Sequence, residues 1–241
     1  RDLAGQLDRH GVDCRLLTVE EMRGTTGSGH YVGGLLHPAG GQLNPLKYAR
    51  GLAAAARTAG ARIFSDTPVT GIAREGEAWT LDTPRARVTA QQVLFATNGY
   101  TDGLVPQLRR SVIPVFSAIL ASAPLPEEMA QRILAGGQSL FEVGPVTTYY
   151  RVDADRRLIF GGRDRMGEAQ GPDAFPSLAA YAEKLWPGIG RVGWEYGWNG
   201  RVAVTGDHYL HLHRHEETGI ACLGYNGRGV AMATAMGREL A

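Results

Sequence analysis

Short apolar segments alternate with glycine, proline and polar turns along this 241-residue chain, and this pattern predicts a mixture of strands and helices. Residues 93–97 and 219–223 are continuous apolar runs, which are typical of buried strands in a parallel sheet. Residues 78–81 and 86–89 predict an antiparallel hairpin. A helix rich in small residues is predicted over residues 230–241, after the second apolar run and a glycine-rich turn.

Capping signals set the ends of further helices. Asn44 and Pro45 suit the N-cap and the first helical position of an alanine-rich helix that ends at Gly60. Thr18 and Glu21 form a capping-box pattern, which predicts the start of a short helix. Other elements are expected over residues 2–10 (helix), 12–18 (strand), 61–65 (strand) and 67–72 (extended).

The middle third of the chain has a different pattern, in which strands follow one another through short turns. This order predicts a mainly antiparallel sheet with covering helices. The strands are expected over residues 112–122, 146–152, 158–162 and 191–198, and the helices over residues 126–135 and 177–185.

Charge and composition exclude several classes of protein. Lysine and arginine number 25 against 24 acidic residues, and no basic run is interleaved with aromatics, so no nucleic-acid partner is expected. The most apolar stretch, residues 112–121, contains Pro114 and is too short to span a bilayer. Cys14 and Cys222 lie far apart in sequence, which favours a reduced, cytoplasmic protein.

Three histidines alternate near the end of the chain. His211, His213 and His215 would share one face of a strand or loop. No Cys, Asp or Glu completes a set at ligand spacing, so we expect no metal site there. Glu216 and Glu217 follow, and a solvated polar turn explains them equally well.

A glycine-rich turn separates the last predicted strand from the last predicted helix. Such an arrangement places backbone N–H groups and a positive helix end against an anion or an electron-rich ring. The glycines fall at positions 224, 227 and 229, so the turn is not a G-x-G-x-x-G fingerprint. Taken alone, the turn is either a cofactor-binding or a purely structural feature.

The order of several motifs carries more information than any one of them. They are Gly33-Gly34, Asn44-Pro45 with its helix, Gly60-Ala-Arg-Ile, Thr67-Pro-Val, Leu94-Phe-Ala-Thr-Asn-Gly-Tyr100, Trp198-Asn-Gly, Thr205-Gly-Asp207 and Gly224-Tyr-Asn-Gly-Arg-Gly-Val230. As a series, they make the chain resemble the FAD-dependent oxidoreductases of the D-amino-acid oxidase type, a group that includes glycine, sarcosine and gamma-glutamylputrescine oxidases. The resemblance covers almost the whole chain.

The resemblance implies an α/β fold with two domains. A discontinuous FAD-binding domain of the Rossmann-like, glutathione-reductase type is expected over residues 1–29, 45–110 and 200–241. A substrate domain with a large mixed or antiparallel sheet is expected over residues 30–44 and 111–199. Family members begin with a strand, a G-x-G-x-x-G turn and an acidic residue for the ribose. The strand with its glycine turn and the acidic residue are both absent, so we expect a fragment that lacks the first βαβ unit.

The resemblance also implies the cofactor contacts. The helix after the glycine turn would stabilise negative charge at the flavin N1–C2=O edge. Arg228 either adds a cation there or is a solvated turn residue. The implied FAD-binding residues are Val69 on the adenine side, Thr97, Asn98 and Gly99 beside the dinucleotide, and Gly224, Tyr225, Asn226, Gly227, Arg228, Gly229 and Val230 facing the flavin ring.

The expected substrate follows from one position. Glycine-oxidase-like members carry an arginine just after Trp-x-Gly, which pairs with the substrate carboxylate. Here Val202 occupies that position, and Arg201 lies one place away, on the opposite face of a strand. This departure favours an amine without that carboxylate, such as a polyamine derivative, while Arg163 remains a candidate to bind an anionic group.

The substrate-side candidates are Tyr150, Arg163, His30 and Tyr31. Tyr149 and Tyr150 are consecutive on a strand, so only one can face the flavin. We favour Tyr150, and core packing is the alternative for either ring. His30 and Tyr31 lie in a loop that resembles the family's substrate-side segment.

The activity implied by the resemblance is oxidation of an amine C–N bond by FAD, with reoxidation by oxygen or another acceptor. One alternative is an oxidase or dehydrogenase of amino acids such as glycine, sarcosine or a D-amino acid. In that case Arg163 or Arg201 would hold the carboxylate. The other alternative is a non-catalytic fragment or subunit.

Overall fold

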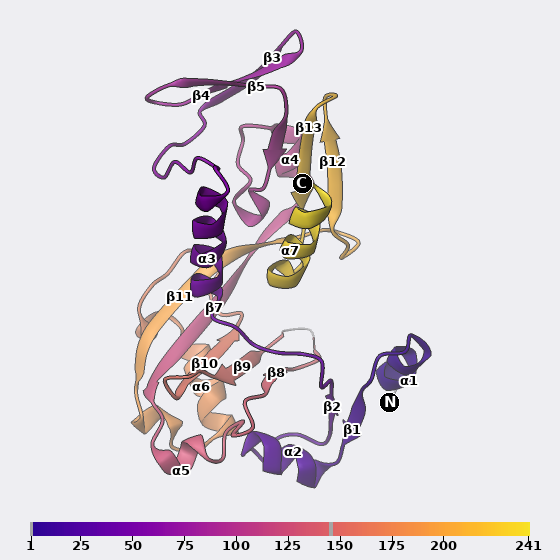
Figure 1. Ribbon diagram of the computed structural model, residues 1–241. Coiled ribbons are helices and arrows are strands. Elements are labelled where there is room, and N and C mark those ends of the chain that lie inside the picture. The colour runs from indigo at the N-terminus through magenta and orange to yellow at the C-terminus, as the bar shows by residue number, and fades with distance from the viewer. Residues whose placement is uncertain (1, 145–146) are drawn as a thin grey trace. The chain divides into compact units, whose positions relative to one another are not determined.

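The computed structural model describes residues 2–144 and 147–241, and their contacts divide the chain into two compact units. Unit 1 comprises residues 1–43 and 116–200, and unit 2 comprises residues 44–115 and 201–241. Each unit is therefore built from two separate stretches of sequence. Figure 1 labels most of the helices and strands of both.

Unit 1 combines a two-stranded antiparallel sheet, β1-β2, with a five-stranded sheet. The sheet has the order β11-β7-β10-β9-β8, and its pairs β7–β10, β10–β9 and β9–β8 are antiparallel. Strands β7 and β11 continue past the boundary between the units. The elements are α1 (Asp2–Arg9), β1 (Arg15–Leu17), α2 (Val19–Thr26), β2 (Gly34–Leu36), β7 (Ile113–Pro124), α5 (Glu127–Ala130), β8 (Ser139–Phe141), β9 (Tyr149–Val152), β10 (Arg157–Gly162), α6 (Pro176–Leu185) and β11 (Trp194–Val204).

The core of unit 1 lies between this sheet and α6. Leu120 of β7, Phe160 of β10 and Tyr150 of β9 share one face because they are paired in register. Leu178 and Leu185 of α6 pack into the same cluster. Burial of such side chains contributes about 1.5–3 kcal/mol each, so this layer is the main source of stability for the unit.

Helix α2 begins as its sequence predicts. The Thr18 hydroxyl accepts a hydrogen bond from the Glu21 N–H at 3.2 Å, and the Glu21 carboxylate accepts one from the Thr18 N–H at 2.8 Å. Gly27 ends the helix with φ of +69°. The expected capping box is confirmed.

Unit 2 contains two three-stranded sheets and two long helices. One sheet has the order β12-β13-β6, in which β13 is antiparallel to β12 and parallel to β6. The other is the antiparallel meander β3-β4-β5. The elements are α3 (Pro45–Thr58), β3 (Gly71–Glu75), β4 (Ala78–Asp82), β5 (Arg87–Ala90), β6 (Val93–Phe95), α4 (Pro106–Arg110), β12 (His211–His215), β13 (Gly219–Leu223) and α7 (Gly229–Glu239).

One face of the β12-β13-β6 sheet is covered and the other is open. Phe95, Ala221 and Leu223 are buried in a second core cluster. Leu94 and Ile220 are register partners on the opposite face, and their exposed fractions are 52% and 39%.

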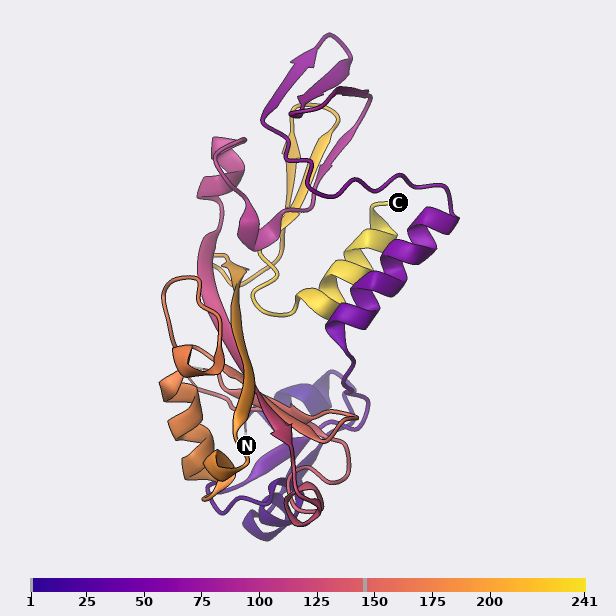
Figure 2. The same cartoon turned by 90° about the vertical axis from the view of Figure 1, so that its left-hand side faces the viewer.

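Helices α3 and α7 lie side by side in both views (Figures 1 and 2). The hydroxyls of Tyr48 and Thr234 are 2.8 Å apart and join them. Neither helix has a buried residue, although both are rich in alanine and other small residues. The faces of both helices that carry small side chains are therefore exposed in this chain.

Most of the predicted elements form, including the parallel pair β6–β13 and the hairpin β4–β5. Two predictions are wrong. Residues 61–65 form no strand, because they are exposed and pair with no other strand in the described chain. The helix predicted over residues 126–135 covers only Glu127–Ala130, and the chain then continues through turns to Leu134, which has φ of +50°. Strand β8 was not predicted, and Val146, the expected start of β9, lies outside the described residues.

Residues 1–29, which the resemblance assigns to the FAD-binding domain, make their contacts within unit 1. The domain bounds themselves stay a prediction. The Leu134 N–H donates to the Thr25 carbonyl at 3.1 Å, and the Trp186 indole donates to the Thr26 carbonyl at 2.9 Å. These two bonds hold the end of α2 against the residues around α5 and α6.

Candidate functional site

The glycine turn in unit 2 connects β13 to α7 and has an unusual backbone. Gly224, Asn226 and Gly227 have φ of +78°, +51° and +84°. A Cβ atom on Gly224 would lie 2.3 Å from the Cγ2 atom of Thr205. Glycine is therefore required at position 224 for both its conformation and its lack of a side chain.

Two segments that the resemblance assigns to the cofactor meet at this turn. The Asn98 side-chain oxygen accepts a hydrogen bond from the Gly224 N–H at 3.1 Å. The Asn226 side-chain oxygen accepts one from the Thr205 N–H at 2.9 Å. A Cβ atom on Gly99 would lie 2.5 Å from the Arg201 carbonyl oxygen, so this segment packs closely as well.

A hollow of about 360 Å³ opens beside these segments in unit 2. Its volume falls in the range of small-molecule sites. The Tyr225 hydroxyl donates to the Cys222 sulfur at 3.1 Å, and burial raises the pKa of Tyr225, so the phenol stays protonated at neutral pH. The lining residues are Leu94, Ala96, Asn98, Cys222, Tyr225, Gly229, Ala233, Met236, Gly237 and Leu240.

These residues fit part of a flavin dinucleotide. The hollow is mainly apolar, as a ring system requires, and it extends to the first turn of α7 at Gly229. No side chain in the described chain caps α7, so its first N–H groups are available to an electron-rich group. Asn98, Tyr225 and Gly229 are the predicted residues that would line a bound cofactor.

Other predicted cofactor residues are less directly placed. The Thr97 hydroxyl shares a hydrogen bond with Thr101 at 2.7 Å. Arg228 and Val230 are exposed at the start of α7. Val69 is half-buried in the segment before β3.

A network of side-chain hydrogen bonds in unit 1 joins three of the four substrate-side candidates. The Tyr150 hydroxyl donates to the Tyr31 hydroxyl at 2.8 Å, which donates to a Glu142 carboxylate oxygen at 2.7 Å. The Tyr181 hydroxyl donates to both Glu142 oxygens at 3.0 Å and lies 3.4 Å from the His30 Nε2 atom. Glu142 is thus the common acceptor of the network.

The three phenols of this network are donors at neutral pH. Burial, and then the neighbouring Tyr150 and Glu142, raise the pKa of Tyr31. Burial also raises the pKa of Tyr150, and burial with the Glu142 carboxylate raises that of Tyr181 to about 12. All three phenols therefore keep their protons and can donate to the carboxylate.

Sequence reasoning missed Glu142 and Tyr181. Glu142 follows a short strand with no motif around it, and Tyr181 lies on α6 among core residues. Only the fold brings them to Tyr31, because 111 residues separate Tyr31 from Glu142. No pattern in the sequence could have found this pairing.

The remaining substrate-side candidate lies outside this network. Arg163 is exposed beyond the end of β10. Tyr149 points to the opposite face of the sheet from Tyr150, where its hydroxyl lies 2.8 Å from the Ser117 hydroxyl. Tyr150 itself packs in the core of unit 1, edge-on to Trp186 with ring centres 4.9 Å apart. The structure thus gives Tyr150 the packing role that was the alternative for it, along with its place in the network.

The position from which the resemblance predicts the substrate class lies in unit 2. Arg201 is exposed, and its guanidinium lies 5.4 Å from the centre of the Tyr100 ring. Val202 is half-buried beside it.

The alternating histidines lie on β12 as expected. His211 Nε2 lies 3.0 Å from the Asp207 carboxylate, and this hydrogen bond lowers the pKa of Asp207 to about 2. His215 packs between the rings of Trp79 and Phe95. Within the described residues, no group of three His, Cys, Asp or Glu side chains is arranged to hold a metal ion.

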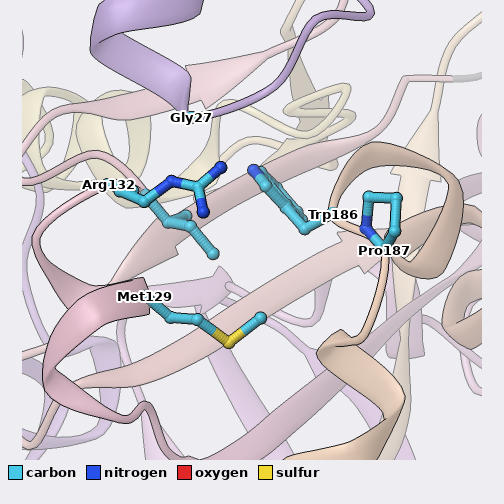
Figure 3. Close-up of a pocket in the computed structure, with 6 residues that line it drawn as sticks. Gly27, Met129, Arg132, Trp186 and Pro187 are labelled. Atoms are coloured by element: carbon cyan, nitrogen blue, oxygen red, sulfur yellow. The ribbon is translucent and has the colours of Figure 1, made fainter.

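A smaller hollow of about 60 Å³ lies in unit 1 (Figure 3). It has room for only a few water molecules, so it is not a candidate for the cofactor. It is lined by Gly27, Met129, Arg132, Ile133, Trp186 and Pro187.

Two further observations concern the cysteines and the helices. Cys14 and Cys222 are both free thiols. In the described part of the chain, every helix is too short or too polar to cross a bilayer.

Solved structures resemble this fold. Glycine oxidase from Bacillus cereus covers 95% of this chain with a TM-score of 0.79 and 20% identity, and 63% of that enzyme is covered. Glycine oxidase from Geobacillus kaustophilus has the same TM-score at 23% identity, covering 93% of this chain and 60% of that enzyme. These likenesses confirm the expected α/β fold.

Curated relatives match in sequence. The Probable oxidoreductase OrdL of Haemophilus influenzae is 33% identical over 219 residues, covering 89% of this chain and 50% of the relative. The Gamma-glutamylputrescine oxidoreductase of Escherichia coli is 29% identical over 236 residues, covering 97% of this chain and 55% of the relative. The chain spans about half the length of these relatives. The model of one family, described as FAD dependent oxidoreductase, matches residues 1–241, and the chain therefore belongs to that family, whose cofactor is FAD.

Proposed function

We propose that the protein oxidises the C–N bond of an amine with FAD, in the manner of a gamma-glutamylputrescine oxidase. The observation that carries the proposal is the hydrogen bond between Asn98 and Gly224, which brings two segments together beside an apolar hollow at the start of α7. The family is FAD-dependent, and one relative is a Gamma-glutamylputrescine oxidoreductase.

In this proposal, unit 2 holds the flavin. FAD, when bound, would supply two-electron oxidation. The neutral amine would lose a hydride from its α-carbon and a proton from its nitrogen, and water would hydrolyse the resulting imine to a carbonyl compound and an amine. The uncapped N–H groups at the start of α7 would stabilise negative charge on the reduced ring. Asn98 would hold the glycine turn in position. Oxygen is the proposed acceptor of the electrons.

Val202 supports an amine over an α-amino acid as the substrate. A valine offers no bidentate contact to a carboxylate, and the Arg201 guanidinium instead stacks on Tyr100. Oxidation of an amino acid is the second candidate, and the exposed side chains of Arg163 and Arg201 are what favour it.

The experiment is anaerobic reduction of the FAD-loaded, full-length protein. Bleaching of the flavin by putrescine derivatives, but not by glycine, sarcosine or D-alanine, is expected. Bleaching by the amino acids alone would support the second candidate. No bleaching by any amine or amino acid would contradict both and favour a non-catalytic role. We also place the protein in the cytoplasm, a proposal that its two free cysteines support.

A further inference from the structure

Asn226 lies in the glycine turn between β13 and α7, and its backbone is in the left-handed region at φ of +51°. Asparagine is one of the few residues besides glycine that adopt this conformation readily. The Asn226 N–H donates to the Ala203 carbonyl at 3.1 Å, and the Asn226 side-chain oxygen accepts from the Thr205 N–H at 2.9 Å. Ala203 and Thr205 are 0% and 1% exposed. The turn is therefore anchored to a buried part of unit 2.

Gly224, the first residue of the turn, is held by two side-chain amides. Its N–H donates to the Asn98 side-chain oxygen at 3.1 Å, and its carbonyl oxygen accepts from the Asn226 side-chain nitrogen. Hydrogen bonds weaken steeply when they are bent, so a rotation of the backbone at Gly224 would break one of the two. The two asparagines therefore fix the direction in which the chain leaves β13.

The side-chain amide of Asn226 has its partners within unit 2. Besides Gly224, its nitrogen donates to the Thr205 hydroxyl at 3.1 Å, and that hydroxyl donates to the Tyr209 carbonyl at 2.7 Å. A primary amide has two N–H donors, so both are engaged. The side chain of Asn226 therefore acts on the backbone of the turn, and its influence on a ligand passes through that backbone.

The turn leads to the hollow that is proposed to hold the flavin. Helix α7 begins at Gly229, which lines this hollow together with Asn98 and Tyr225. The Arg228 N–H donates to the Tyr225 carbonyl at 2.9 Å, which closes the turn just before the helix. The attraction of a helix end for negative charge falls off within one turn, so it depends on where the preceding residues place that end.

We propose that Asn226 is a positioning residue for the flavin, which acts through Thr205 and Gly224. It holds the glycine turn, and with it the first N–H groups of α7, where they stabilise negative charge on the ring. This inference rests on the proposed place of the flavin in unit 2. The residues that carry it all belong to that unit.

The competing explanation is that Asn226 only stabilises the fold of unit 2. Loss of its side chain would then lower the melting temperature and leave the chemistry of the bound flavin unchanged. The two explanations therefore differ in how readily the bound flavin takes negative charge when the side chain is removed.

The test uses the full-length protein loaded with FAD and titrated with sulfite. Sulfite adds to the oxidised flavin, leaves negative charge on the ring and bleaches its visible absorbance. Asn226→Gly removes the side-chain hydrogen bonds, while glycine adopts the left-handed backbone without strain. The sulfite dissociation constant should rise by about 3- to 10-fold in this variant, which is the size of effect that a displaced helix end allows.

The control is Glu216→Gly, which makes the same kind of change at an exposed residue with φ of +56°. Glu216 precedes β13, at the end of the strand opposite the glycine turn, so the sulfite affinity should stay within about twofold. Thermal melts check folding. If Asn226→Gly is poorly folded, Thr205→Val decides, because it removes the hydroxyl that accepts from Asn226 and should raise the sulfite dissociation constant by about two- to fivefold.

Equal sulfite affinity of the wild type and Asn226→Gly would overturn the proposal. A wild-type flavin that binds no sulfite would overturn it too, because negative charge on the ring would then not be stabilised. If no amine reduces the flavin but Asn226→Gly weakens sulfite binding, the proposed function fails and this inference stands. If amines reduce the flavin and sulfite affinity is the same in both proteins, this inference fails and the proposed function stands.

Discussion

At the scale of single residues, the half-buried His213 has a ring nitrogen without a hydrogen-bond partner. Its Nε2 atom is buried and makes no hydrogen bond within the described part of the chain. Burial, and then the neighbouring His211, lower the pKa of His213. The unfolded chain, with a histidine pKa of about 6.5, takes up this proton more readily than the folded one. Stability is therefore greatest above that pH and falls as the pH drops below it.

We expect His213→Phe to reduce this loss. Thermal melts at pH 7.5 and pH 5.0 measure the drop in Tm for each protein, and the drop should be smaller in the variant than in the wild type. His37→Gln changes an exposed histidine and serves as the control. A drop of unchanged size in His213→Phe would contradict the assignment.

Gly99 is a second residue for which the structure explains the identity, because it leaves no room for a side chain. An alanine there would bring its Cβ atom to 2.5 Å from a backbone oxygen, which cannot rotate away. Gly99→Ala should therefore destabilise the fold by about 1–3 kcal/mol, as measured by urea unfolding. Gly103→Ala is the matched control, because its added methyl group meets nothing within 4 Å. Equal stability of the two variants would show that the backbone at Gly99 can move.

At the scale of elements, the N-terminal cap of α2 is the clearest local interaction that stabilises a helix. Thr18→Ala removes the hydroxyl that accepts from Glu21 and should cost about 0.5–2 kcal/mol in chemical denaturation. Thr18→Ser keeps the cap and should cost less than about half a kcal/mol. If both variants lose the same stability, the methyl group of Thr18 matters and the cap does not.

The sequence could predict those elements that carry a local signal, such as a capping residue at a helix start. Asn44 accepts from the Lys47 N–H at 3.0 Å, so the predicted start of α3 is confirmed by its cap. Residues 61–65 have the composition of a strand, but a strand also needs a neighbour, which no local signal supplies. The same limit applies to the site. The glycine turn carried a sequence signal, whereas Glu142 and Tyr181 join Tyr31 only through the tertiary fold.

At the scale of the whole molecule, unit 2 exposes an apolar sheet face and an unpaired edge. Leu94, Ile220 and Leu212 lie on one face, and β6 has no partner except β13 in the described chain. Open edges without charges pair readily with other chains. The chain studied alone should therefore associate as its concentration rises.

Leu94→Lys should weaken this association by placing a charge on the open edge strand. Sedimentation velocity over a range of concentrations measures the effect. Val88→Lys changes an equally exposed residue on β5, in the other sheet, and should leave the association unchanged. A monomeric wild type at all concentrations would contradict the prediction.

The discontinuity of both units bears on how the chain folds during synthesis. Strand β6 at residues 93–95 pairs with β13 at residues 219–223, so more than a hundred residues must leave the ribosome between the two. Pairing across such a separation raises the contact order and slows folding. Until β13 has been synthesised, the apolar side chains of β6 and of the hairpin that precedes it stay exposed to solvent. A chaperone has the most time to bind them during that interval.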